Sequence, residues 1–183
     1  VPMNMRQDAL VGAAEIIVAL RHIATQIPGA PTVGTVGTIK VFPASRNIIA
    51  EEVELTIDLR DIDLERRNTY ETQLRDQIEI ICKKHKLTYS ITEDFKSEPR
   101  YCADWLKQII HTQCTNLNLQ APELMSGPYH DAMALSYVTD YAMIFVRCKD
   151  GISHNPLEFA SYEDLALGTE VLYRTMLDVL SKE

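Results

Sequence analysis

The chain has 183 residues, of which 46% are hydrophobic and 24% charged, and its formal net charge is −8 at pH 7. This negative charge argues against a nucleic-acid partner, because phosphate binding requires a basic surface. No apolar run approaches the roughly 20 residues that a helix needs to cross a bilayer, so no membrane association is expected. The four cysteines are scattered without a CxxC pair, which predicts free thiols and a cytoplasmic protein.

The first half of the chain predicts helices mixed with strands. Apolar residues recur every three or four positions where a helix is expected, and they alternate with polar ones where a strand is expected. The expected elements are a helix over 3–27, strands over 33–42 and Glu52–Arg60, a helix over 64–86 and a strand over Leu87–Phe95. One further strand in front would complete a ferredoxin-like βαββαβ unit. Because the sequence also opens on Val1 directly before a periodic helix, we expect a piece of a longer protein.

After a seam near Lys96–Pro99, the pattern changes to that of an α/β domain. The expected elements are a helix over 100–117, a strand over Glu123–Met125, a helix over His130–Val138, a strand over Ala142–Arg147 and a helix over 162–181. The last helix has Ser161 as its cap and an apolar stripe that includes Leu165, Leu172 and Met176. This part is too small to be a complete doubly wound domain.

Two histidines stand where α/β proteins place their sites, directly after an expected strand. His130 follows a glycine turn that leads into a helix, and His154 follows the strand that ends at Arg147. A neutral imidazole in a rigid turn is a good ligand for a divalent metal. The alternatives are an ordinary helix start at His130 and a polar loop at His154. One histidine is not a metal site, because zinc is bound by about four ligands.

Two further residues can bind a carboxylate or an amide. Arg60 ends a strand on its polar face, and a guanidinium can grip a carboxylate with two parallel hydrogen bonds. The alternative for Arg60 is a surface ion pair with Asp61 or Asp63, which would contribute little. Asn47 lies in a connecting loop, where it is either a turn residue or a contact to a substrate.

Four segments of the chain resemble, in order and spacing, the motifs of one family. They are Pro2-Met3 with Arg6 and Asp8-Ala9-Leu10; Asn47 with Ile57-Asp58-Leu59-Arg60-Asp61; Ser126-Gly127 with His130-Asp131-Ala132; and Gly151-Ile152-Ser153-His154-Asn155-Pro156, followed by Glu158. The family is that of the dinuclear metal-dependent amidohydrolases and metallopeptidases. Its resembling branch holds the N-carbamoyl-L-amino-acid hydrolases, the allantoate amidohydrolases and the β-ureidopropionases.

The resemblance implies a two-domain organisation and a set of residue roles. Residues 1–96 would be a partial lid domain that also forms a homodimer, and 97–183 the C-terminal half of a zinc-peptidase-like catalytic domain. His154 would be a metal ligand, and His130 would contact the substrate beside two divalent ions, Zn or Mn. Asn47 and Arg60 would bind the substrate carboxylate, in this family often at the partner subunit's site. The reaction implied is hydrolysis of the carbamoyl C–N bond of an N-carbamoyl-L-amino acid or a ureido acid such as allantoate.

The chain departs from the family pattern in two respects. Pro128-Tyr129 replaces two small residues before His130, so Tyr129 is expected to contact the substrate and either to narrow the pocket or to change the substrate that it accepts. The general base and the other metal ligands are expected upstream, so no catalytic residue is assigned here and the chain alone is expected to be inactive. Two other readings stay open, a related aminoacylase or dipeptidase, and a piece that acts only as a dimerisation or binding module.

Overall fold

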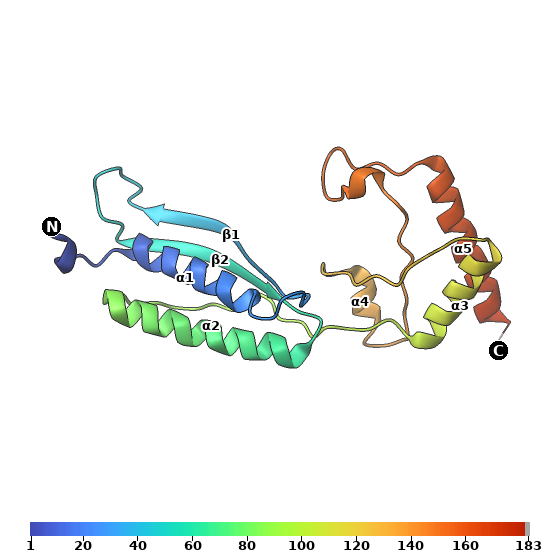
Figure 1. The fold of residues 1–183 in the computed structure, drawn as a ribbon, viewed down its shortest axis with the longest axis horizontal. Helices are drawn as coiled ribbons and strands as arrows, with labels where there is room; N and C mark the ends of the chain where they lie inside the picture. The colour runs from blue at the N-terminus through green and yellow to red at the C-terminus, as the bar shows by residue number, and fades with distance from the viewer. Residues whose placement is uncertain (182–183) are drawn as a thin grey trace. The chain divides into compact units, whose positions relative to one another are not determined.

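The computed structural model describes residues 1–181, which form two compact units, one over Val1–Pro99 and one that begins at Arg100. The division falls at the end of the expected seam, and each unit is mixed helix and extended chain (Figure 1). The N-terminal unit contains η1 (Met3–Met5), α1 (Ala9–Ala24), β1 (Val33–Phe42), β2 (Glu52–Arg60) and α2 (Leu64–His85). No helix among the described residues is long and apolar enough to cross a membrane.

Strands β1 and β2 form an antiparallel hairpin whose two faces differ in character. Val33 lies opposite Arg60 and Phe42 opposite Glu52, and a bulge at Gly37 shifts the register between Val36 and Thr38. Along β2 every second residue is exposed, as the alternation in the sequence predicts. The charged residues of β2 therefore share the solvent face, while its apolar residues face the two helices.

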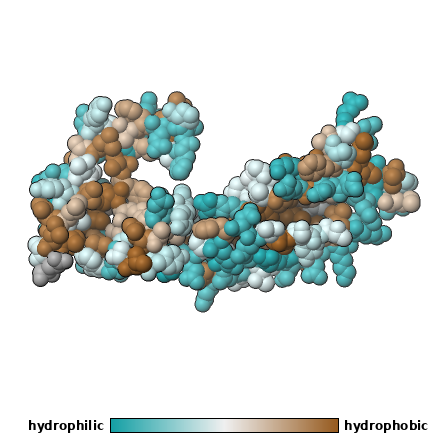
Figure 2. Space-filling model, turned by 180° about the vertical axis from the view of Figure 1, so that it is seen from behind, coloured by the Kyte–Doolittle hydropathy of each residue, from teal (hydrophilic) through white to brown (hydrophobic). Residues whose placement is uncertain are grey.

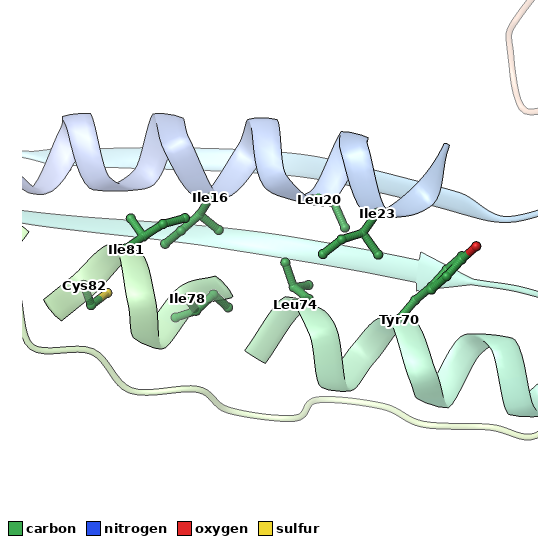
Figure 3. Packing of buried hydrophobic residues seen from close by; sticks show 8 residues of the cluster. All are labelled: Ile16, Leu20, Ile23, Tyr70, Leu74, Ile78, Ile81 and Cys82. Carbon is green, nitrogen blue, oxygen red and sulfur yellow. The ribbon is translucent and has the colours of Figure 1, made fainter. Parts of the chain in front are cut away.

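Helices α1 and α2 pack together and against one face of the hairpin. Figure 3 shows Ile16, Leu20 and Ile23 of α1 among the buried residues Tyr70, Leu74, Ile78, Ile81 and Cys82 of α2. Val36, Ile57 and Leu59 of the strands pack against this cluster. Gly34 lets β1 approach α1 closely, since a Cβ there would lie 3.0 Å from Leu20 and 3.1 Å from Ala24. The helical stripes expected from the sequence thus form the core.

The first helix begins later than the sequence pattern indicates. Residues 3–5 form a separate 3-10 turn, and α1 starts only after Asp8. The carboxylate of Asp8 accepts hydrogen bonds from the backbone N–H groups of Leu10 and Val11. This N-cap satisfies amide groups that have no partner inside the helix, so the chain cannot continue as helix through Asp8.

The strand expected over Leu87–Phe95 does not form, which corrects the sequence prediction. In the described part of the chain the sheet has two strands, and this segment pairs with neither of them. A strand exists only through hydrogen bonds to a neighbour, so its apolar alternation alone is not sufficient. The start of the segment is nevertheless fixed, because Leu87 packs against the core and its N–H donates to the carbonyl of Cys82 at 2.8 Å.

The C-terminal unit is built from helices and extended segments. Its elements are α3 (Asp104–Asn116), α4 (Asp131–Leu135), η2 (Lys149–Gly151) and α5 (Tyr162–Leu180). The strands expected at Glu123–Met125 and Ala142–Arg147 do not form, and these segments have no regular secondary structure, for the same reason as Leu87–Phe95. Residues 142–147 pack on α5 instead, and a Cβ at Gly168 would lie 2.6 Å from the Val146 side chain.

Helix α5 buries a different face from the one its sequence predicts. Ser161 caps the helix as expected, accepting a hydrogen bond from the N–H of Asp164 at 3.0 Å. However, Val171 and Thr175 are the buried residues, whereas the expected stripe of Leu165, Leu172 and Met176 is exposed. Figure 2 shows hydrophobic residues over much of the visible face of this unit. Burial depends on the elements that surround a helix, and here α3 packs against α5, with Gln113 of α3 hydrogen-bonded to Asp178 of α5, while Val146 lies against Gly168.

The core predicts that Leu20 is the residue whose truncation destabilises the N-terminal unit most. Its side chain is 2% exposed, and removal of a buried leucine side chain leaves a cavity. We expect Leu20→Ala to lower the free energy of unfolding by about 2–5 kcal/mol. Equilibrium urea unfolding followed by circular dichroism measures the change. Val18→Ala, at a position 54% exposed in the same helix, is the matched control. Equal effects of the two substitutions would contradict the packing described.

Candidate functional site

Arg60 lies at the end of β2 with its guanidinium gripped by a carboxylate of the same strand. Its Nε donates to Oδ1 of Asp58 at 2.8 Å, and its Nη2 donates to Oδ2. Both side chains are 48% exposed. The hydrogen bonds that Arg60 donates to Asp58 hold the pKa of Arg60 above its ordinary value. The expected alternative was an ion pair of Arg60 with Asp61 or Asp63. The carboxylate that pairs with Arg60 is that of Asp58 instead, because strand alternation places residues 58 and 60 on one face.

Asp61 turns inward and anchors the end of the strand behind Arg60. Its carboxylate accepts hydrogen bonds from the Thr32 hydroxyl, from the N–H of Asp63 at 2.8 Å and from Nε of Arg66 at 2.6 Å. Burial would raise the pKa of Asp61, but the hydrogen bonds from Arg66, Thr32 and Asp63 outweigh it and leave the pKa lowered. The carboxylate therefore joins the start of β1, the end of β2 and the start of α2.

Asn47 lies at the other end of the hairpin, in the exposed loop between β1 and β2. Its Oδ1 accepts a hydrogen bond from the Ser45 hydroxyl at 3.3 Å. A strand rises about 3.3 Å per residue, so the nine residues of β2 place its two ends roughly 26 Å apart. The structure therefore does not bring Asn47 and Arg60 together, and one chain cannot present both to the same small carboxylate.

His130 is held in a defined orientation at the start of α4. Its Nε2 lies 2.5 Å from Oγ of Ser126, and its ring meets that of Phe145 edge-on with centroids 5.8 Å apart. The backbone at His130 is extended, which makes it the N-cap residue of the short helix. Tyr129 beside it is 48% exposed. The hydroxyl and the aromatic ring together fix the imidazole, as a binding role requires.

His154 lies in a tight turn with an exposed side chain. Its φ is 55°, and those of Asp150 and Gly151 are 57° and 68°, so three left-handed residues reverse the chain here. The N–H of His154 donates to the carboxylate of Glu158 at 2.9 Å, and the N–H of Leu157 donates to the side chain of Asn155 at 2.9 Å. Hydrogen bonds within the loop therefore fix the backbone of His154, and its imidazole is exposed to solvent.

The residues present do not by themselves form a metal centre. Over residues 1–181 no group of three or more His, Cys, Asp or Glu side chains is arranged to hold a metal ion. His154 can supply one nitrogen ligand, and a stable zinc site uses about four ligands. The donor set of this chain is thus at most a part of such a site.

A comparison with protein families decides the classification. The model of peptidase family M20/M25/M40 matches residues 8–178, which is nearly the whole chain. The chain belongs to this family. Its resemblance to metal-dependent amidohydrolases, stated above on four short motifs, is thereby confirmed at the level of the family.

The relatives of this M20 chain include enzymes that act on C–N bonds outside peptides. It is 44% identical to an N-carbamoyl-L-amino-acid amidohydrolase of Pseudomonas sp. (strain NS671) over 177 residues, 97% of this chain and 43% of that protein. A ureidoglycolate hydrolase of Arabidopsis thaliana is 35% identical over 95% of this chain and 37% of its own length. The chain therefore spans less than half the length of these relatives.

Solved structures of the family share the fold. A hydantoinase/carbamoylase family amidase from Burkholderia multivorans superimposes with a TM-score of 0.89 at 32% identity, over 97% of this chain and 43% of that chain. A more distant Bacillus subtilis protein, described as a dinuclear metal binding peptidase of the M20 family, has a TM-score of 0.70 at 16% identity, over 95% of this chain and 47% of that chain. The second likeness concerns the fold alone.

Sequence reasoning missed two contacts that shape the candidate site. It did not assign Asp58 as the partner of Arg60 or Ser126 as the partner of His130. Signals for both were present, since residues two apart share a strand face. A serine four residues before a histidine, across a glycine, can also reach its ring through a turn.

The buried carboxylate of Asp61 predicts a pH dependence of stability. The pKa of Asp61 is lower in the folded than in the unfolded chain, so its contribution is fully present above the unfolded pKa. We expect it to be lost as the pH falls from about 4 through the folded pKa.

Urea midpoints measured from pH 2 to pH 7 follow this loss. Asp61→Asn should flatten the acid limb, and Asp76→Asn, at an exposed position of α2, should leave it unchanged. Equal acid limbs for Asp61→Asn and the unaltered chain would show that this carboxylate is not the group responsible.

Proposed function

We propose that the whole protein is a metal-dependent amidohydrolase that cleaves the carbamoyl C–N bond of N-carbamoyl-L-amino acids or of related ureido acids such as allantoate. The observation that carries this proposal is the 44% identity to an N-carbamoyl-L-amino-acid amidohydrolase over 97% of the chain. The ureidoglycolate hydrolase among the relatives also acts, by its name, on a ureido acid. Substrates of this class carry a carboxylate, and Arg60 offers a guanidinium to bind it.

Each unit carries residues to which we assign a role in binding substrate or metal. In the N-terminal unit, taken as a partial ferredoxin-like lid, Arg60 binds the carboxylate of the substrate. In the C-terminal unit, taken as part of a catalytic domain, His130 donates a hydrogen bond to the carbamoyl group and Tyr129 narrows the pocket. His154 supplies one metal ligand, and the other ligands and the general base come from the rest of the protein. A pair of divalent ions, Zn or Mn, would supply an activated water in the whole enzyme.

The separation of Asn47 and Arg60 supports a dimer as the active form. Asn47 lies in the loop before β2 and Arg60 is the last residue of β2, a strand of nine residues that spans roughly 26 Å. If both bind substrates, each must serve a different site, and the simplest arrangement gives one of them to the site of a partner subunit. A homodimer through the N-terminal unit therefore forms part of the proposal. The free thiols of Cys82, Cys102, Cys114 and Cys148 agree with a cytoplasmic location.

Two alternatives are separated from this proposal by substrate tests. A related aminoacylase or dipeptidase would prefer N-acyl amino acids or dipeptides over N-carbamoyl amino acids. A piece that acts only in dimerisation or binding would show no turnover in the whole protein. The pair Asn47 and Arg60 and the turn that carries His154 favour the carbamoyl substrates, since both match the carbamoylase branch of the family.

The first functional prediction concerns turnover and metal. The full-length protein, purified with Mn²⁺ or Zn²⁺, should release ammonia from N-carbamoyl-L-amino acids, and a chelator should abolish this activity until metal is returned. His154→Ala should lower both the metal content, measured by mass spectrometry, and the activity, the latter by at least about 100-fold. His111→Ala, at an exposed position of α3, is the matched control. Faster turnover of dipeptides than of carbamoyl amino acids would contradict the assigned substrate class.

The second functional prediction tests whether sites are shared between subunits. Asn47→Ala and Arg60→Ala should each inactivate the full-length dimer. If the two residues serve different sites, a mixed dimer of the two variants contains one intact site. Random mixing after reversible dissociation should then recover about a quarter of the original activity. Absence of any recovery, although mass spectrometry detects the mixed dimer, would contradict the shared site.

A further inference from the structure

A cavity of about 450 Å³ lies beside the N-terminal half of α2, where the segment that follows this helix runs back along it (Figure 1). It is lined by residues of α2 between Leu64 and Thr72 and by residues 96–98. We propose that this cavity, the Arg67 cavity, binds a free α-amino acid as a zwitterion. The residues with an assigned role toward substrate or metal do not line it, so the inference goes beyond the proposed function.

Arg67 carries a positive charge that the chain satisfies only in part. The residue is 9% exposed, and its Nη1 and Nη2 donate hydrogen bonds to the backbone carbonyl of Ser97 and to Oδ1 of Asn68. Both acceptors are neutral, and the buried Nε has no hydrogen-bond partner among residues 1–181. A guanidinium has five N–H donors, so each Nη group keeps one donor for a further acceptor. Because a buried charge is tolerated when it is paired, an anionic group beside Arg67 would stabilise it.

The two acceptors of Arg67 show where its guanidinium ends. Asn68 and Ser97 both line the cavity, so the Nη groups that donate to them lie at its wall. Nε is covered by protein atoms, so a ligand would meet the Nη groups. A carboxylate is the anionic group that we assign here, because its two oxygens match two parallel N–H donors of a guanidinium.

Carboxylates on the same wall disfavour a simple anion and provide a site for an ammonium group. Arg67 and Lys96 carry positive charge and Glu71 and Glu98 negative charge, so the lining has no net charge. Glu71 accepts one hydrogen bond from Lys96, at 2.7 Å, and two from Arg75. The hydrogen bonds from Lys96 and Arg75 outweigh burial and leave the pKa of Glu71 lowered. An ionised carboxylate offers about four acceptor sites, so Glu71 can accept one more hydrogen bond.

A zwitterionic amino acid carries both of the groups that this wall can bind. Arg67 and Glu71 are four residues apart on α2, so their side chains are neighbours on one face of the helix. The carboxylate of the ligand would accept from Arg67, and its ammonium group would donate to Glu71. The volume lies in the range of small-molecule sites, so an amino-acid side chain also has room. An L-amino acid is also a product of the proposed reaction, so the full-length enzyme would itself produce this ligand.

The test is isothermal titration calorimetry of the full-length protein with glycine as the probe. The protein carries Arg60→Ala, so that the proposed substrate site does not contribute. We expect glycine to bind about tenfold more tightly than acetate or methylamine, since each analogue lacks one charged hydrogen-bonding group. Arg67→Met should weaken the binding of glycine by about tenfold or more. Lys83→Met, at an exposed position of the same helix outside the cavity, is the matched control and should leave the affinity unchanged.

A second variant tests the cavity without altering the buried arginine. Thr72→Phe, at an exposed position of the cavity wall, should fill the cavity and abolish the binding of glycine. Its circular dichroism spectrum and urea midpoint should match those of the unaltered protein, which shows that the fold is retained. Equal affinities for glycine in Thr72→Phe and in the protein with Thr72 would overturn the inference, whether or not Arg67→Met folds.

The outcomes separate this inference from the proposed function. Absence of glycine binding would overturn the inference and leave the proposed function intact, because turnover of N-carbamoyl-L-amino acids is measured independently. Acetate that binds as tightly as glycine would also overturn it, since the cavity would then be a site for a simple anion. Glycine binding that depends on Arg67 and Thr72 in a protein without carbamoylase activity would overturn the proposed function alone.

Discussion

The buried carboxylate of Asp61 is the interaction on which the arginine end of the N-terminal unit depends. It accepts hydrogen bonds from the residue directly before β1, from the turn after β2 and from α2. A buried charge is tolerated only when it is paired and hydrogen-bonded, and Asp61 meets this condition. Because the strand alternates, the inward direction of Asp61 and the outward direction of Arg60 are two consequences of one backbone path. The anchor therefore decides where the candidate substrate-binding residue points.

The length of the hairpin is the second constraint on function. It holds Asn47 and Arg60 at opposite ends of β2, and no movement of side chains can cover that separation. Residues that a single sequence motif links can thus serve different sites. In the proposed dimer, the length of the hairpin places Asn47 at one substrate site and Arg60 at the other.

The sequence correctly predicted features that depend on one segment alone. Its predictions were wrong where the structure of a segment depends on the elements that pack or pair with it. The alternation along Glu52–Arg60 and the apolar stripes of α1 and α2 were confirmed, because each can be read from one segment. The strands expected at 87–95, 123–125 and 142–147 were wrong, because a strand also needs a partner with which to pair. The prediction of the buried face of α5 was wrong for a similar reason, since it depends on the elements that pack against this helix, α3 among them. The roles assigned to Asn47, Arg60, Tyr129, His130 and His154 stay predictions.

Pairing also explains why the partner of Arg60 was missed. Three carboxylates lie close to Arg60 in the sequence, those of Asp58, Asp61 and Asp63. Their proximity in sequence alone does not show which of them pairs with Arg60. Strand alternation excludes Asp61 as the partner of Arg60, because its side chain is buried on the other face. Asp63 is the N-cap residue of α2. Asp58 is then the carboxylate that shares the face of Arg60.

The most direct test of the account is a crystal structure of the full-length protein with an N-carbamoyl-L-amino acid bound. The account requires the substrate carboxylate on the guanidinium of Arg60, and His154 on a metal ion beside the carbamoyl group. It also requires Asn47 of that chain at the site of a partner subunit. A substrate bound without Arg60, or a metal centre without His154, would contradict it.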